Sequence, residues 1–135
     1  MLKFLRFNIG GFFGGYDEVR LWIYKNSAKY EILSMNFNRI EKLDLYENKR
    51  LPIKNLEQLS EWGALGVNSW ADEYSVCCFD GTQWRLSYRE EGKKIRYISG
   101  SNAYPHQWKR FMEWLDMLMP EMEFKKYIEE NEDTY

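Results

Sequence analysis

The residues of this chain that could carry out catalysis are few and scattered. The single histidine, His106, directly follows Pro105 at the start of a predicted helix, where it could act as a general base. A general base needs an oriented partner and a nucleophile to activate. Cys77 and Cys78 are candidate nucleophiles, but they lie in an apolar stretch, where a thiol stays protonated and inert. We therefore expect His106 to be a solvent-facing or capping side chain, and we expect no catalytic residue and no enzyme activity.

Metal ions, paired carboxylates and phosphate loops are no better supported. One histidine and two adjacent cysteines are too few ligands for a zinc site, so we expect no bound metal. Carboxylates stand near predicted turns at Asp17, Glu18, Glu73 and Asp80, yet no spacing among them favours a hydrolase pair. The glycine-rich loop 10–15 is not followed by Gly-Lys-Ser/Thr and opens no helix, as a phosphate-binding loop would require. We expect no cofactor and interpret the loop as a hairpin connection or bulge.

Basic residues gather on the last predicted hairpin, at Arg85, Arg89, Lys93, Lys94 and Arg96. Cations combined with aromatic rings on a sheet are typical of proteins that bind single-stranded nucleic acid. The same residues also fit an ordinary solvated sheet face, on which two neighbouring glutamates dilute the positive charge. The segment 129–133 holds several acids and would repel a phosphate backbone. Nucleic acid is therefore an alternative partner that the sequence does not favour.

Composition fits one soluble globular domain that covers residues 1–135. The chain has 19 Lys and Arg against 21 Asp and Glu, a net charge of −2, so no global field steers it to nucleic acid or to an anionic membrane. It contains no apolar run near the ~20 residues of a membrane span, and its start has no signal-peptide pattern. The two cysteines are adjacent and give no disulfide framework. We therefore expect a cytoplasmic protein without membrane contact.

The first third of the chain predicts three strands, over 2–9, 18–25 and 30–37. In the second strand, aliphatic residues alternate with charged or aromatic ones, which is the pattern of a half-buried strand. The apolar set is Val19, Leu21 and Ile23, and the alternate set is Arg20, Trp22 and Tyr24. Residues 38–74 are less regular, since the apolar positions 40, 43 and 46 have helical spacing over too short a run. A helix over 55–63 is predicted by Asn55 as N-cap, with Gln58 three residues later.

The stretch 79–119 predicts a hairpin followed by a helix. Asp80-Gly81 is a strong turn signal, and the strand after it places Trp84, Leu86 and Tyr88 on one face. The last strand is predicted over 93–99, with Ile95 and Tyr97 on the core side. Pro105 favours a helix start, and an apolar stripe at spacings of three and four predicts an amphipathic helix over 105–119. The stripe consists of Trp108, Phe111, Met112, Leu115 and Leu118.

The corner between this last strand and the helix has its own turn chemistry. We expect Gly100 to adopt a backbone conformation that is awkward for other residues, and we expect the Asn102 side chain to bond the local backbone. The functional alternative is that Asn102 and Tyr104 face a ligand. Residues 120–135 predict a short helix or a frayed acidic tail.

Several of these residues also form a recurring pattern, namely Trp70, Tyr74, Asp80, Gly81, Thr82, Trp84, Leu86, Gly92, Gly100, Asn102, Tyr104 and Pro105. In this respect the C-terminal half resembles a family of small proteins from Firmicutes and their mobile elements. The family pattern is Trp…Tyr, Asp-Gly-Thr-x-Trp-x-Leu, a glycine turn, and Gly-x-Asn-x-Tyr-Pro before an amphipathic helix. The family has no established activity, so the resemblance implies a bacterial or phage origin and carries over no catalytic residue.

These patterns together predict an α+β fold. We expect an antiparallel sheet of about five or six strands, with the C-terminal amphipathic helix packed on one face and the 55–63 helix beside it or at its edge. The favoured function is a non-catalytic module that binds another protein, of the immunity, inhibitor or anti-defence kind. The alternatives are a small-ligand or nucleotide binder that uses exposed aromatics, and a single-strand nucleic-acid binder that uses the last hairpin.

The expected binding surface consists of Phe12, Phe13, Trp22 and Tyr24. A helix covers only one face of a sheet, and large rings left together on the other face are costly to expose unless a partner uses them. The competing interpretation is that residues 38–66 fold over these rings and bury them in a second core.

Overall fold

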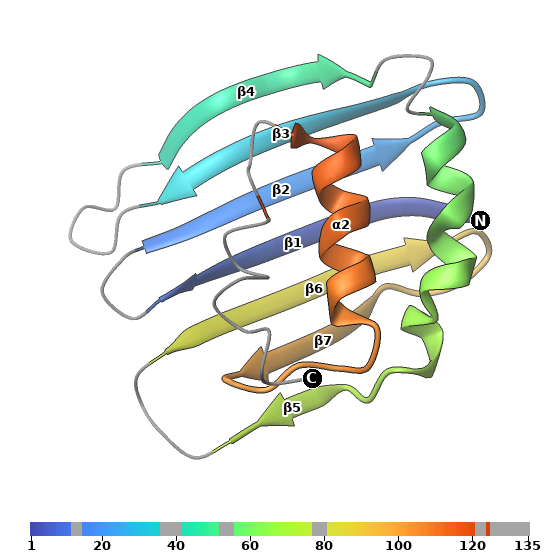
Figure 1. Ribbon diagram of the computed structural model, residues 1–135. Coiled ribbons are helices and arrows are strands. Elements are labelled where there is room, and N and C mark those ends of the chain that lie inside the picture. Colours follow the sequence, from blue (N-terminus) through green and yellow to red (C-terminus); the bar gives the residue numbers. More distant parts are fainter. Residues whose placement is uncertain (12–14, 36–41, 52–55, 77–80, 121–123, 125–135) are drawn as a thin grey trace.

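The computed structural model describes residues 1–11, 15–35, 42–51, 56–76, 81–120 and 124. Its centre is a seven-stranded sheet in the order β4-β3-β2-β1-β6-β7-β5 (Figure 1). The strands are β1 Leu2–Gly11, β2 Gly15–Ile23, β3 Ala28–Met35, β4 Lys42–Arg50, β5 Glu73–Ser75, β6 Thr82–Glu90 and β7 Arg96–Ser101. Neighbouring strands in this sheet run antiparallel, except that the three-residue β5 lies parallel to β7. The predicted α+β fold is confirmed, and the parallel pair of β5 and β7 is an exception to the expected antiparallel sheet.

The N-terminal strand β1 lies in the middle of the sheet, between β2 and β6. Leu5, Phe7 and Ile9 alternate along it and are fully buried. In the partner strands, Val19 and Leu21 of β2 are buried in the same core, as their alternation predicts. The local pattern and the pairing therefore agree about which face of the central strands is covered.

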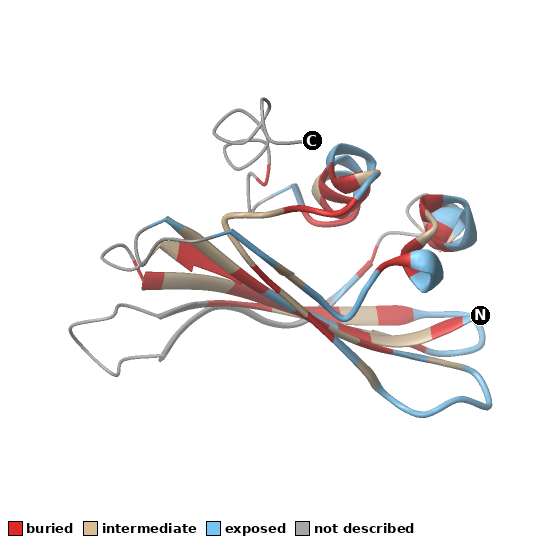
Figure 2. Ribbon diagram, turned by 90° about the horizontal axis from the view of Figure 1, so that it is seen from below, coloured by how far each residue is buried: buried red, intermediate tan, exposed pale blue. Residues whose placement is uncertain are grey.

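The described helices all lie on one face of the sheet, as Figure 2 shows. They are the 3₁₀ helices η1 Glu57–Leu65 and η2 Val67–Ser69 and the α-helix α2 Trp108–Leu118. The predicted stripe of α2 is confirmed, since Trp108, Phe111 and Leu115 are fully buried. The α-helix begins at Trp108 rather than Pro105, because Pro105 and His106 form a turn that ends in Gln107 at a positive φ of 73°.

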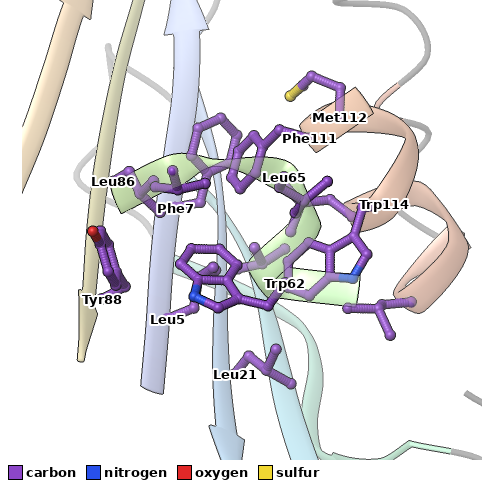
Figure 3. Close-up of a cluster of buried hydrophobic side chains, with 14 of the residues drawn as sticks. Leu5, Phe7, Leu21, Trp62, Leu65, Leu86, Tyr88, Phe111, Met112 and Trp114 are labelled. Carbon is purple, nitrogen blue, oxygen red and sulfur yellow. The ribbon is translucent and has the colours of Figure 1, made fainter. Parts of the chain in front are cut away.

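The core between helices and sheet is rich in aromatic rings (Figure 3). Phe111 of α2 packs edge-on against Phe7 of β1, with ring centroids 5.3 Å apart, and against Trp70 at 5.4 Å. Helix η1 joins the same core, because the Trp62 ring lies 5.5 Å from Trp114 of α2 and the Trp114 Nε1 donates to the Gln58 carbonyl at 2.8 Å. Offset and edge-on ring pairs of this kind add stabilisation beyond the area they bury.

The tail returns one residue to this core. The Phe124 ring is buried and lies 6.1 Å from the Phe7 ring, and its backbone N–H donates to Asp116 Oδ1 at 3.1 Å. The remaining residues beyond Pro120, for which a helix or a frayed tail was predicted, lie outside the described part of the chain.

The corner between β7 and α2 is built differently from the expectation. Gly100 does not adopt a positive φ; the positive φ falls on Asn102, at 55°. Gly100 is needed for space instead, because an added Cβ would lie 2.1 Å from Nε1 of the buried Trp84. Asn102 does bond a backbone group, as predicted, but the group is not local: its Oδ1 accepts from the Thr82 backbone N–H at 2.9 Å, 20 residues earlier in the chain. Asn102 thereby ties the corner to the start of β6.

The prediction of which β7 side chains face the core was wrong. Ile95 and Tyr97 were expected on the core side, but they are 43% and 68% exposed, and Ile98 is buried instead. The strand starts at Arg96, and its register sets Ile98 opposite the buried Leu86. Since side chains alternate between faces, a shift of one residue exchanges the core and solvent positions.

Arg96 holds the segment between η2 and β5 against the sheet. Its Nη1 donates to the Val67 carbonyl at 3.0 Å and to the Tyr88 hydroxyl at 3.1 Å, and its Nη2 donates to Asp72 Oδ1 at 3.0 Å and to the Trp70 carbonyl. Burial alone lowers the pKa of Arg96, but the hydrogen bonds to Tyr88 and Asp72 outweigh it and raise the pKa above its usual value. This arginine is a structural clamp.

Candidate functional site

The face of the sheet opposite α2 and η1 carries rows of polar side chains. It is here called the helix-free face, because none of the described helices covers it. In one row across the strands, the register aligns Glu73, Ser99, Arg85, Asn8 and Glu18, from β5 to β2. The next row aligns Tyr97, Ser87, Arg6, Arg20 and Glu31, from β7 to β3. Cross-strand neighbours on one face are close enough to interact. These rows of polar side chains are the candidate functional site.

Glu18 is the hub of the helix-free face. Its side chain is only 2% exposed, although it points away from the main core. Its Oε1 accepts from Arg6 Nε at 2.9 Å and from Asn8 Nδ2 at 3.2 Å, and its Oε2 accepts from Arg20 Nε at 2.8 Å. Both carboxylate oxygens are therefore satisfied by charge-assisted or amide donors, as a buried carboxylate requires.

A pocket with a volume of about 430 Å³ opens on the same face. Its lining crosses five strands and is mostly polar. The lining residues whose register places them on the helix-free face are Arg6, Asn8, Tyr16, Glu18, Glu73, Ser75, Gln83, Arg85, Ser99 and Ser101. The pocket thus contains two arginines, two carboxylates, three serine hydroxyls and two amides, a set that suits a polar ligand group better than an apolar one.

The two arginines of the pocket keep hydrogen-bond donors to spare. Arg6 uses Nε for Glu18, and within the described part of the chain no hydrogen bond occupies its Nη atoms. Arg85 is exposed and, among the described residues, makes no hydrogen bond and no ion pair. A guanidinium has five N–H donors in a planar fork, so the pocket presents unused donors from two sides.

Two of the four predicted binding residues are described by the structure. Trp22 lies on the helix-free face, half-buried, where its ring packs 6.0 Å from the ring of Phe4, and Lys29 Nζ lies 5.3 Å from its centroid. Tyr24 follows the end of β2 and is 49% exposed. The prediction that Trp22 points away from Val19 and Leu21 is therefore correct, and one side of its ring is already occupied by a cation.

Phe12 and Phe13 lie outside the described residues. The loop that contains them joins Gly11 to Gly15, whereas Trp22 is seven residues further along β2. At about 3.3 Å per residue, Gly15 and Trp22 are roughly 23 Å apart. The structure therefore brings Trp22 together with Phe4 and Lys29 rather than with the glycine-flanked end of the hairpin.

The competing interpretation, that residues 38–66 cover the rings, does not fit the described part of that segment. Strand β4 extends the sheet edge beside β3, and η1 packs on the opposite face, where Trp62 contacts Trp114 and Tyr88. The helical spacing at 40, 43 and 46 was misleading, because positions 43 and 46 belong to β4.

Of the remaining catalytic candidates, the structure describes only part. His106 is exposed in the turn before α2. Cys77, Cys78 and Asp80 lie outside the described residues. Among the residues that the structure describes, no group of three or more His, Cys, Asp or Glu could hold a metal ion.

The predicted basic cluster divides between the faces of the sheet. Arg85 and Arg89 are on the helix-free face, opposite Asn8 and Phe4 of β1, whereas Arg96 is the clamp on the helix side. No helix in the described part of the chain is long and apolar enough to cross a membrane.

Sequence reasoning missed the pairing of Arg6, Asn8 and Arg20 around Glu18. A signal was present, because Arg6 and Asn8 stand at alternate positions before the glycine-rich loop, and Glu18 and Arg20 stand at alternate positions after it. The hairpin register converts this spacing into contact by setting Asn8 opposite Glu18 and Arg6 opposite Arg20.

Comparison of the chain with protein-family models, with curated proteins and with solved structures finds no match. The geometry of the helix-free face therefore carries the functional argument.

Proposed function

We propose that this protein is a non-catalytic module that binds an acidic surface of another protein through the helix-free face of its sheet. A role of the immunity, inhibitor or anti-defence kind fits such a module. The observation that carries the proposal is the exposure of Arg6, Arg85 and Arg89 on a face that none of the described helices covers.

The charge on this face is segregated by depth. Of its described acids, Glu18 and Glu31 are buried or half-buried and pair with Arg20, at 2.8 Å and 3.8 Å respectively, and Glu73 alone is exposed. The exposed cations are left in excess, although the whole chain has a net charge of −2. Complementary charge gives an interface its specificity and raises its association rate, so an acidic partner surface is the complement that this face selects.

The rings on the same face support a protein partner. Tyr97 is 68% exposed on β7, in the row that contains Arg6 and Arg20. The half-buried pair of Phe4 and Trp22 lies in the neighbouring row. Tyrosine, tryptophan and arginine are the residues enriched at the energetic centres of protein interfaces. A nucleotide that stacks on Trp22 is less well supported, because Lys29 already occupies that ring.

Single-stranded nucleic acid is the second candidate, because Arg85, Arg89 and Tyr97 share one sheet face. Cations and exposed rings on a sheet also suit nucleic acid. Treatment with nuclease during partner capture separates the two functions, since it removes a nucleic-acid partner and leaves a protein partner bound.

The test of the proposal is a pair of charge reversals. Arg85→Glu with Arg89→Glu alters the helix-free face, and Lys109→Glu with Arg110→Glu alters exposed positions of α2. After a partner has been captured from the native host and purified, binding should fall by at least ~100-fold for the first variant and by less than ~3-fold for the second. Equal affinity for both variants would contradict the proposal.

A further inference from the structure

We infer that the 430 Å³ pocket of the helix-free face is a receptor for an oxyanion. The inference rests on the proposed function for one point, namely that the oxyanion is the side-chain carboxylate of an aspartate or glutamate of the partner protein. The pocket itself is argued from the contacts of Arg6 and Arg85 and from the polar groups between them.

The first element is the orientation of Arg6. Glu18 is almost fully buried and holds Arg6 by Nε at 2.9 Å, so the guanidinium has a fixed position before any ligand arrives. The Arg6 side chain is nevertheless 47% exposed, Arg6 lines the pocket, and its Nη groups make no hydrogen bond to any described residue. An arginine fixed in this way loses little side-chain entropy when it binds a carboxylate.

The second element is Arg85, which lies on the neighbouring strand. Arg85 is opposite Asn8, and Arg6 is opposite Ser87, so the two arginines are diagonal neighbours on β1 and β6. Their Cα atoms are therefore about 7–8 Å apart, close enough for both guanidinium groups to reach one carboxylate. Arg85 has no acid partner among the described residues, which leaves its charge available.

The third element is the polar wall of β7. Ser99 is opposite Arg85, and Ser101 is opposite Gln83, whose Nε2 donates to Ser101 Oγ at 2.8 Å. The Ser99 hydroxyl lies beside Arg85 and can donate to the same oxyanion. Hydroxyl and amide donors beside a cation pair are the groups that hold an anion in place.

Glu73 provides a test of whether the ligand of the pocket is an anion or a cation. It lines the rim of the pocket on β5, next to Ser99, and is exposed. A carboxylate at this position repels an anion and attracts a cation. Removal of its charge should therefore strengthen binding of an oxyanion, whereas it would weaken binding of a cationic ligand.

The experiment is a titration of the purified protein with succinate, and separately with inorganic phosphate, at constant ionic strength. The readout is the NMR signal of the arginine Nε–Hε groups and of the Ser99 amide. Saturable shifts are expected at Arg6, Arg85 and Ser99 with succinate. Shifts that stay linear, or that are as large at the Nε–Hε group of Arg110 on α2, would overturn the inference.

Three variants complete the test. Arg85→Gln should weaken succinate binding by about tenfold, because it removes one charge-assisted partner. Glu73→Gln should strengthen it by about two- to fivefold, and Lys109→Gln should leave it unchanged. All three positions are exposed, so the fold is retained and is checked in the same spectra. Weaker binding in Glu73→Gln would overturn the assignment of an anion.

The two probes distinguish the source of the oxyanion. Similar or tighter binding of succinate supports a carboxylate from a protein. Phosphate binding at least tenfold tighter than succinate would overturn the carboxylate and assign a phosphate group instead. The titration uses the protein alone, so its failure leaves the charge-reversal result on the partner untouched, and the proposed function can fail while the pocket still binds succinate.

Discussion

Gly100→Ala should destabilise the protein strongly, although the backbone at Gly100 is conformationally ordinary. An ideal Cβ at this position would lie 2.1, 2.2 and 2.5 Å from three ring atoms of Trp84. Ordinary contacts begin at 3.4 Å, so the ring would have to move by more than an ångström. Trp84 is 1% exposed and has little room to move, because the rings of Trp108 and Tyr74 lie 4.7 and 6.1 Å from its own.

The magnitude follows from two costs. Insertion of a methyl group into a packed core costs about 1–3 kcal/mol. Displacement of the ring also breaks the hydrogen bond from Trp84 Nε1 to the Ala103 carbonyl, 3.0 Å long, and leaves a buried donor unpaired for about 1–3 kcal/mol. We expect a total of about 2–6 kcal/mol, or a melting temperature lower by about 7–20 °C for a chain of this size.

The assay is thermal and urea unfolding followed by circular dichroism, with Gly63→Ala as the matched control. Gly63 is exposed in η1, and a Cβ there meets no atom within 4 Å. The control should be neutral or more stable by up to about 1 kcal/mol, because alanine restricts the unfolded chain. Equal melting temperatures for the two variants would refute the argument that Gly100 is required by the Trp84 ring.

Three further changes test the core, the clamp and the hub. Phe111→Ala should lower the free energy of unfolding by about 3–5 kcal/mol in urea titrations, because a fully buried ring is removed; an unchanged melt would place the stripe elsewhere. Arg96→Lys should cost about 1–3 kcal/mol, because an ammonium cannot reproduce the fork; unaltered urea unfolding would argue against the clamp. Since the pKa of Arg96 is raised, its contribution is complete below the unfolded-state pKa and is lost only as pH rises through the higher folded-state pKa. Glu18→Gln should cost about 1–2 kcal/mol, reduced from the value of a fully buried pair because both arginines are partly exposed, and stability equal to the parent would mean that the hub contributes nothing.

The elements that could be predicted are those whose signal lies in a short stretch of sequence. The stripe of α2 needs only the helical period, and the faces of β2 and β6 need only alternation. A backbone hydrogen bond of Asn102 could also be predicted, because asparagine in a strand-to-helix corner has few partners other than backbone groups, but its actual partner, Thr82 at the start of β6, could not.

The elements that could not be predicted depend on pairing between distant strands. The predicted strand over 93–99 has apolar side chains at both odd and even positions, namely 95, 97 and 98, so alternation alone does not decide which face of β7 is buried. The register with β6 decides which face of β7 is buried. It also places Arg96 on the helix side, where its guanidinium donates to the Val67 carbonyl. Strand β4 was missed for a similar reason, because its assignment comes from pairing with β3 rather than from its own spacing.

The candidate site was only partly predictable. Alternation placed Trp22 correctly on the face away from the helices, and the positions of Phe12 and Phe13 remain a prediction. The pocket could not be foreseen, because its lining comes from five strands whose order is known only from the fold. The hub at Glu18 needed the hairpin register to become visible.

The most direct test of the account is photo-crosslinking from each face of the sheet–helix sandwich. Tyr97 is 68% exposed on the helix-free face, and Met117 is 51% exposed on α2, so the two positions are matched in exposure and differ in face. Each is replaced in turn by benzoylphenylalanine, and the complex with the captured partner is irradiated. The account predicts a covalent adduct with the partner from position 97 and none from position 117. An adduct from position 117 alone, or equal adducts from both, would contradict the claim that the helix-free face is the binding surface.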